Sequence, residues 1–233
     1  MDRLDRPEQH SRNLERHVAG RTGITTPSVM VGGKVYRVYQ PETADALIDE
    51  AEFDRDERLP YWADLWPSSI ALARHVSGMD LSGKRVVEVG CGVGLPAMAA
   101  LTNGAEVTVT DHYEAALDFA LHNARENTGC SFAAAMLDWR VPETWRDATE
   151  AGRFDVLLGA DVLYEPRNVE PLADVVEALL TPEGEALFAD PGRREAGKFL
   201  EEMGRRGFES EATVRTVEGE PEVRSTIHRL YRS

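Results

Sequence analysis

One stretch of the chain constrains the fold more than any other. An apolar, β-branched run over 86–89 breaks into three alternating glycines within 90–94, and a helical pattern follows at once over 96–101. This order predicts a strand, a tight loop and a helix, in which glycine lets the backbone approach a ligand and the free N–H groups of the helix start favour a negative group. A second strand over 105–110 delivers Asp111, which is well placed to accept hydrogen bonds from ribose hydroxyls. The unit therefore predicts a site for an adenosine-bearing ligand.

The residues around the glycines narrow the choice of ligand. A dinucleotide-binding fingerprint needs glycine where this chain has Leu95, and no Gly-Lys-Ser/Thr follows as a P-loop requires. Glu88 stands two residues before the first glycine. A carboxylate there would repel a pyrophosphate, but it suits a ligand that carries an ammonium and a sulfonium group. S-adenosylmethionine is such a ligand, and we expect Glu88 to orient its methionine end, directly or through water.

Charge and cysteine content limit the partners. The chain has 26 Lys and Arg against 41 Asp and Glu, a net charge of −15, so nucleic acid is not an expected partner. The acidic surface is either simply solvated or recruits a basic protein. Two cysteines, and six histidines without ligand spacing, predict no metal. Because no signal peptide and no membrane span are visible, we expect a cytoplasmic protein that binds no membrane.

The chain divides into an extension and a main domain. Residues 1–58 are interpreted as an N-terminal extension with a polar arm, a β-hairpin over 29–39 and an acidic helix over 43–53. Residues 59–233 form the main domain, in which five strand–helix steps are followed by a closing strand pair. This order is typical of an α/β fold whose sheet is mostly parallel with an antiparallel edge.

The expected elements of the main domain can be given by residue ranges. Strands are expected over 86–89, 105–110, 131–136, 153–164 and 185–189, and the closing pair over 208–217 and 224–232. The main helices are expected over 68–76, 96–101, 114–127, 167–180 and from 193 to about 206, with a break at 181–184.

Two aromatic positions could hold a flat ring. Asp138 and Trp139 follow the third strand at the edge where open α/β sheets bind ligands, so the carboxylate could accept from an exocyclic amine while the indole packs on its ring. Trp66 precedes a helix that begins with Pro67 and could form a wall of the same site. Core packing of a large aromatic is the alternative for each tryptophan.

In this order the motifs resemble class I S-adenosylmethionine-dependent methyltransferases. Residues 88–94 are similar to motif I of that family, and residues 61–193 resemble the group that includes protein lysine methyltransferases and nicotinamide N-methylase-like proteins. The matching pieces are 66–67, 137–139 and 161–164, the last of which fits a D-x-x-Y motif. The resemblance implies a Rossmann-like seven-stranded sheet of order 3-2-1-4-5-7-6 with helices on both faces.

Two further stretches narrow the resemblance. Residues 61–63 with 66–67, and residues 190–193, look most like the lysine methyltransferase branch that acts on the electron-transfer flavoprotein β-subunit. The chain departs from the family where it has Glu88 in place of the common Asp, and its N-terminal hairpin has no counterpart.

The residue pattern and the resemblance together predict the cofactor site. His112 would flank the adenine, and Asp111 would bind the ribose unless it caps the following helix instead. The expected cofactor-binding residues are Trp66, Glu88, Gly90, Gly92, Gly94, Asp111, His112, Asp138, Trp139 and Ala160.

Asp161 and Tyr164 are the predicted catalytic residues. A lysine ammonium, with a reference pKa of about 10.4, must lose a proton before its nitrogen attacks the methyl group. Asp161 could hold the amine and stabilise the charge that develops on nitrogen, and Tyr164 could offer a hydroxyl or an aromatic face. Alternatively, Asp161 caps the helix over 167–180 or binds loop amides, and Tyr164 only packs.

We therefore predict an S-adenosylmethionine-dependent N-methyltransferase that acts on a lysine of a protein. Two other functions remain open: methylation of a small amine or a pyridine nitrogen, and cofactor binding without catalysis.

Overall fold

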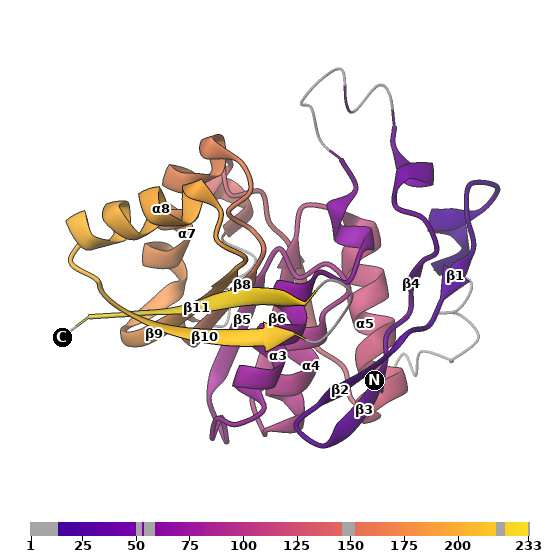
Figure 1. Ribbon diagram of the computed structural model, residues 1–233, viewed down its shortest axis with the longest axis horizontal. Coiled ribbons are helices and arrows are strands. Elements are labelled where there is room, and N and C mark those ends of the chain that lie inside the picture. The colour runs from indigo at the N-terminus through magenta and orange to yellow at the C-terminus, as the bar shows by residue number, and fades with distance from the viewer. Residues whose placement is uncertain (1–13, 50–52, 54–58, 146–151, 218–221, 233) are drawn as a thin grey trace.

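The computed structural model describes residues 14–49, 53, 59–145, 152–217 and 222–232. A seven-stranded sheet runs through its centre, and helices cover both faces (Figure 1). Its strands are β5 (Arg85–Val89), β6 (Glu106–Asp111), β7 (Ala133–Met136), β8 (Phe154–Ala160), β9 (Leu180–Asp190), β10 (Glu209–Val217) and β11 (Val223–Tyr231).

The order of the strands confirms the predicted topology. Across the sheet it is β7-β6-β5-β8-β9-β11-β10, which is 3-2-1-4-5-7-6 when the strands of this sheet are numbered along the chain. The first five strands pair in parallel, and β11 pairs antiparallel with both β9 and β10. The expected antiparallel edge is therefore present, as in other mixed α/β sheets.

Alternation along the strands supplies both faces with apolar side chains. Val86 and Leu158 belong to one buried cluster and Val87 and Leu157 to another, because successive strand residues point to opposite faces. The first cluster packs against α3 (Pro67–Val76), α4 (Leu95–Thr102) and α5 (Glu114–Thr128). The second packs against α7 (Val169–Leu179) and α8 (Arg194–Arg205).

The N-terminal hairpin is also confirmed. Strands β2 (Ser28–Val31) and β3 (Lys34–Arg37) pair antiparallel across two glycines that both have positive φ, 57° and 80°, as a type I′ turn requires. Tyr36 is 2% exposed and donates a hydrogen bond from its hydroxyl to Thr102 of α4, 2.9 Å away. The hairpin therefore shares the apolar core of the main domain. A short pair, β1 (Ile24–Thr25) with β4 (Gln40–Pro41), continues beyond it.

The described part of the arm before the hairpin makes apolar contacts with the rest of the chain, although the arm is polar in composition. Residues 14–18 are helical, and Leu14 and Val18 are buried at i,i+4 spacing in a cluster with Trp62 and Phe119. Residues 1–13 lie outside the described part of the chain.

The helix predicted over 43–53 is wrong over the described residues 43–49. A 3-10 turn, η1 (Asp45–Leu47), forms there and Ile48 after it is extended, whereas Phe53 is helical and its amide donates to the Asp49 carbonyl at 2.9 Å. Leu47 is the one buried residue of this turn, so no apolar stripe is available to hold a longer helix against the core. Residues 50–52 lie outside the described part.

Two strand boundaries differ by more than two residues from those expected. β8 ends at Ala160 rather than running to 164, because Asp161 has a left-handed backbone. β9 begins at Leu180 and includes 181–184, where a break was predicted. Its pairing with β8 shifts register there and then resumes, so the turn-forming residues produce an irregularity instead of ending the strand. The helix expected over 167–180 forms as a 3-10 turn, η4 (Pro166–Asn168), followed by α7.

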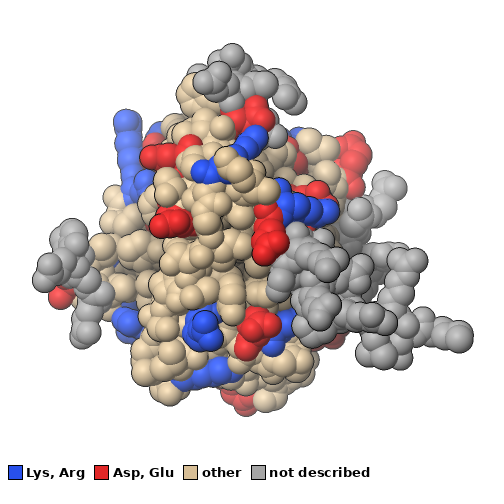
Figure 2. Space-filling view, turned by 90° about the vertical axis from the view of Figure 1, so that its right-hand side faces the viewer, with Lys and Arg blue, Asp and Glu red and all other residues tan. Residues whose placement is uncertain are grey.

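One face of the molecule mixes charges of both signs. On the face shown in Figure 2, acidic and basic side chains are interspersed among uncharged ones rather than gathered by sign. Among the described helices, none is both long and apolar enough to cross a membrane.

Candidate functional site

A cleft opens at the carboxyl ends of the central parallel strands. Its open space measures about 1060 Å³, part of which is open to solvent. Eleven of the twelve predicted site residues line it, from five segments of the chain. They are Trp66, Glu88, Gly90, Gly92, Asp111, His112, Asp138, Trp139, Ala160, Asp161 and Tyr164.

In the loop after β5, two glycine positions lie so close to neighbouring residues that a side chain would not fit. Gly90 and Gly92 have φ of 62° and 50°. A Cβ at Gly90 would lie 2.9 Å from Val162 Cγ1, and one at Gly92 would lie 3.0 Å from the carbonyl oxygen of Trp62. Glycine is therefore required at both positions by conformation and by space.

Gly94 has a different place from the one predicted. It precedes α4 with a φ of 79° and does not line the cleft. A Cβ there would lie 2.9 Å from the Ala120 Cβ, so this glycine allows α4 and α5 to pack closely.

Glu88 lies at the base of the cleft, at the end of β5. Its side chain is buried, and Oε2 accepts a hydrogen bond from the Ala97 amide in the first turn of α4, 2.9 Å away. Burial raises the pKa of Glu88 well above its usual range, and the nearby Asp111 raises it further. Two buried carboxylates so close together favour a cationic ligand, because a positive group would offset the cost of ionising both.

Asp111 ties the glycine loop to β6. Its Oδ2 accepts from the Gly92 amide and its Oδ1 from the Tyr113 amide, both at 3.0 Å. Burial nevertheless raises the pKa of Asp111. Tyr113 itself is the N-cap residue of α5 and makes no side-chain cap, so Asp111 does not cap that helix from the N-cap position. Each carboxylate oxygen can accept a second hydrogen bond, which leaves capacity for ribose hydroxyls.

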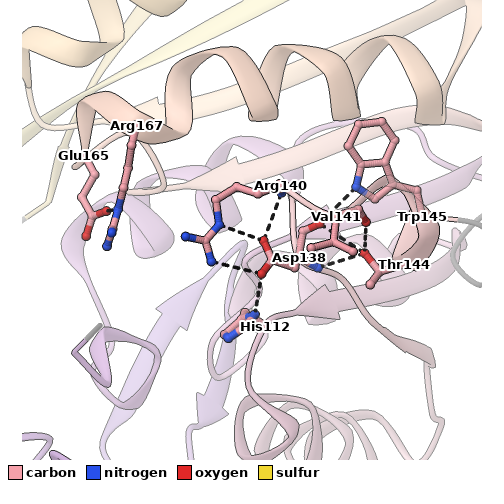
Figure 3. A network of polar contacts seen from close by, with 8 residues as sticks. All are labelled: His112, Asp138, Arg140, Val141, Thr144, Trp145, Glu165 and Arg167. Carbon is pink, nitrogen blue, oxygen red and sulfur yellow. Dashed lines mark hydrogen bonds and ion pairs between the residues drawn. The ribbon is translucent and has the colours of Figure 1, made fainter. Parts of the chain in front are cut away.

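Asp138 has a partner that the sequence analysis missed. The Arg140 guanidinium donates to both carboxylate oxygens at 3.2 Å, and the Arg140 amide donates to Oδ1 at 3.0 Å. His112 Nδ1 lies 3.5 Å from Oδ2, on another side of the same carboxylate (Figure 3). The two predicted adenine-side residues are thus brought together. The ring of Trp139 borders the loop at Gly90.

Asp161 is held by an ion pair rather than by helix capping. It is the one non-glycine residue with positive φ in the described part of the chain, at 58°. Its amide donates to the Ala189 carbonyl at 2.9 Å, and Oδ1 accepts from Arg193 Nε at 2.7 Å and from the terminal guanidinium nitrogen at 2.6 Å. Neither η4 nor α7 has a side-chain cap. The capping alternative therefore does not hold for Asp161.

Tyr164 belongs to an aromatic wall. Its ring meets that of Tyr61 edge-on at 5.3 Å between centroids, and Tyr61 meets Trp66 in the same way at 5.9 Å. Trp66 Nε1 donates to the Tyr61 carbonyl at 2.8 Å, which fixes the indole. Burial raises the pKa of Tyr164 far above its usual value, so its hydroxyl stays protonated at neutral pH and can donate a hydrogen bond.

The sequence analysis missed several further lining residues. Tyr61 was used there only for the resemblance. Glu165 and Arg167 form an ion pair at the rim (Figure 3). Asp64 also lines the cleft, and burial raises its pKa. The acidic lining residues are Asp64, Glu88, Asp111, Asp138, Asp161 and Glu165, against two arginines and one histidine. The lining is therefore acidic, which suits cationic ligands.

Two observations concern cysteine reactivity and metal ligands in the described part of the chain. Burial raises the pKa of the Cys91 thiol well above its usual value, so this cysteine is a poor nucleophile. No group of three or more His, Cys, Asp or Glu side chains there could hold a metal ion.

Comparison with known proteins gives a family and several relatives. Residues 55–206 match a family described as lysine methyltransferase. The protein N-lysine methyltransferase METTL21A of Danio rerio is 34% identical over 157 residues, which cover 64% of this chain and 70% of that protein. The histone-arginine methyltransferase METTL23 of Xenopus laevis is 29% identical over 154 residues, covering 64% and 65%.

The branch named in the sequence analysis is also found. The electron transfer flavoprotein beta subunit lysine methyltransferase of Danio rerio is 28% identical over 137 residues, covering 58% of this chain and 51% of that protein. Among solved structures, a putative S-adenosylmethionine-dependent methyltransferase from Streptococcus mutans superposes with a TM-score of 0.64 at 11% identity, over 91% of this chain and 57% of that one. This last similarity shows the fold alone.

Proposed function

We propose that this chain, which belongs to the lysine methyltransferase family, transfers the methyl group of S-adenosylmethionine to a lysine side chain of a protein. Membership of the family makes the chain an S-adenosylmethionine-dependent methyltransferase, and the protein acceptor is the proposed part. Relatives named for lysine methylation of proteins support it. We place the reaction in residues 59–233, with residues 1–58 as an extension that shares the core through its hairpin.

The cleft residues fit this cofactor by their chemistry. S-adenosylmethionine carries an ammonium group and an activated methyl group on a sulfonium. Glu88, buried beside the glycine loop, would face the ammonium end, and Asp111 would accept from the ribose hydroxyls. Asp138 with His112 would border the adenine, whose face would lie against Trp139. Gly90 and Gly92 let the loop that would border the cofactor pack against Val162 and Trp62.

On the acceptor side, Asp161 and Tyr164 would act on the lysine nitrogen. Asp161 would accept a hydrogen bond from the amine and stabilise the positive charge that develops as nitrogen attacks the methyl group. Tyr164 would donate a hydrogen bond or place its ring beside the methylated ammonium, together with Tyr61. The proton that the ammonium must lose beforehand can leave to water, so no strong base is needed in the cleft.

One observation carries the proposal. Asp161 and Tyr164, from the segment after β8, line the same cleft as Glu88 and Asp111, from the ends of β5 and β6. A donor held by the second pair would therefore lie within reach of an acceptor held by the first. The acidic lining favours a cation for both ligands.

Labelled methyl transfer tests the proposal. S-adenosylmethionine with a tritiated methyl group is incubated with the chain and a protein extract of the source organism, and the products are separated on a gel. We expect a labelled protein band whose hydrolysate contains methylated lysine. Asp161→Asn keeps the shape of the side chain and tolerates a left-handed backbone, and it should lower the rate about 100-fold. Its affinity for S-adenosylhomocysteine, measured by calorimetry, should stay unchanged.

The same experiment separates the alternatives. Methylated arginine in the hydrolysate would indicate an arginine acceptor, the residue type in the name of the METTL23 relative. Label confined to small molecules would favour the small-amine alternative. Cofactor binding with no label in any fraction would contradict the proposed transfer.

A further inference from the structure

Arg193 does not line the cleft, yet it contacts a predicted catalytic residue. Its guanidinium donates twice to Oδ1 of Asp161, at 2.7 and 2.6 Å. The Asp161 side chain is only 5% exposed, whereas that of Arg193 is 33% exposed. Among the described residues, Oδ2 of Asp161 has no hydrogen-bond partner, so this oxygen is the one available to a ligand in the cleft.

The backbone around Arg193 is fixed as well. Oδ1 of Asp190, the last residue of β9, accepts from the amides of Gly192 and Arg193, both at 2.6 Å, and so forms the turn that precedes α8. Asp161 in turn donates its amide to Ala189 of β9. The segment after β8 is therefore joined to strand β9 by one backbone hydrogen bond and to the segment after β9 by one ion pair.

We propose that Arg193 is a positioning residue for methyl transfer. By binding Oδ1, it holds the carboxylate of Asp161 in one orientation and leaves Oδ2 directed to the acceptor nitrogen. This inference rests on the proposed function, since it concerns the acceptor side of that reaction. Without the guanidinium, the carboxylate would turn freely, and a misplacement of about 1 Å costs about 100-fold in rate.

Arg193→Met tests the role, because methionine keeps an unbranched side chain without the donors. The matched control is Arg194→Met, since Arg194 is exposed and has no hydrogen bond or ion pair with a described residue. Rates of labelled methyl transfer into the protein extract are measured against S-adenosylmethionine concentration, and S-adenosylhomocysteine binding reports the fold. We expect Arg193→Met to lower kcat about 10- to 100-fold with an unchanged KM for S-adenosylmethionine. Arg194→Met should match the unaltered chain.

A double substitution shows whether Arg193 acts through Asp161. If it does, Asp161→Asn with Arg193→Met should be no slower than Asp161→Asn alone. Arg193→Lys keeps one donor group and should recover part of the rate. If Arg193→Met does not bind S-adenosylhomocysteine, Arg193→Lys takes its place in every comparison. An unchanged kcat in Arg193→Met, or independent losses in the double variant, would overturn the assignment. Absence of transfer by the unaltered chain would instead overturn the proposed function itself.

Discussion

The close approach of the glycine loop to Trp62 makes Gly92→Ala a quantitative test of the cleft. An L-residue with a left-handed backbone costs about 1–2 kcal/mol, and Gly92 has a φ of 50°. The new methyl group would also lie 3.0 Å from the Trp62 carbonyl oxygen, a backbone atom that cannot turn away as a side-chain end could. Such overpacking costs about 1–3 kcal/mol. The two effects together predict a loss of about 2–5 kcal/mol in the free energy of unfolding.

Gly129→Ala is the matched control. Gly129 ends α5 with a φ of 72°, and a Cβ there would have no atom within 4 Å. This variant should therefore lose only the conformational part, about 1–2 kcal/mol. The difference between the variants, measured by urea unfolding, isolates the contact with Trp62.

The two variants should also differ in cofactor binding. The Gly92 amide donates to Oδ2 of Asp111 at 3.0 Å, so a displaced loop also displaces the carboxylate expected to bind ribose. We expect S-adenosylhomocysteine to bind at least about tenfold more weakly to Gly92→Ala, and with unchanged affinity to Gly129→Ala, by calorimetry. Equal stability losses together with equal affinities would refute the reasoning.

Three further predictions concern burial and charge. Burial raises the folded-state pKa of Glu88, so the protein loses stability as pH rises above about 4.5, the usual glutamate value. Glu88→Gln should remove this loss, so the difference in unfolding free energy between this variant and the unaltered chain, measured in urea, should widen toward pH 8. The variant should also bind S-adenosylmethionine more weakly. Leu14 is 2% exposed beside Phe119, so Leu14→Ala should cost about 2–4 kcal/mol in unfolding free energy, and no measurable loss would contradict the docked arm. Asp118 has a lowered pKa through its contacts with His17 and Arg16, although partial burial opposes the shift. Its stabilisation is thus present above pH 4 and lost as pH falls through the folded-state pKa, and Asp118→Asn should flatten the acid limb of thermal-unfolding curves.

Hydrophobic periodicity and motif order were enough to predict the sheet. The central strands are rich in apolar and β-branched residues and alternate with helices, which predicts a mostly parallel sheet, and the resemblance supplied the order of the strands. The segments that differ are those in which local pattern gives way to tertiary contacts. Over 43–49, where a helix was expected, Leu47 is the one buried residue, and residues 181–184 lie within β9, which pairs with β8 on both sides of them.

The site was predictable where its residues follow strand ends, and less so elsewhere. Asp111, Asp138 and Asp161 line one cleft because the carboxyl ends of parallel strands meet at one edge. The partners of these side chains were missed. Arg193 is 32 residues from Asp161 along the chain, and spacing alone does not indicate which arginine reaches it. Gly94 was assigned to the cofactor because the motif groups three glycines. The fold uses them for two purposes: Gly90 and Gly92 line the cleft, whereas Gly94 allows α4 and α5 to pack closely.

The left-handed backbone at Asp161 has a consequence for engineering. Glycine adopts that conformation without steric cost and asparagine about as readily as aspartate, so the backbone does not oppose loss of the carboxylate, and the ion pair with Arg193 is what such a replacement gives up. A directed-evolution screen that scores only thermal tolerance would therefore retain variants without this carboxylate wherever other substitutions offset the lost ion pair. Libraries built on this scaffold should hold position 161 constant or include a turnover readout in every round.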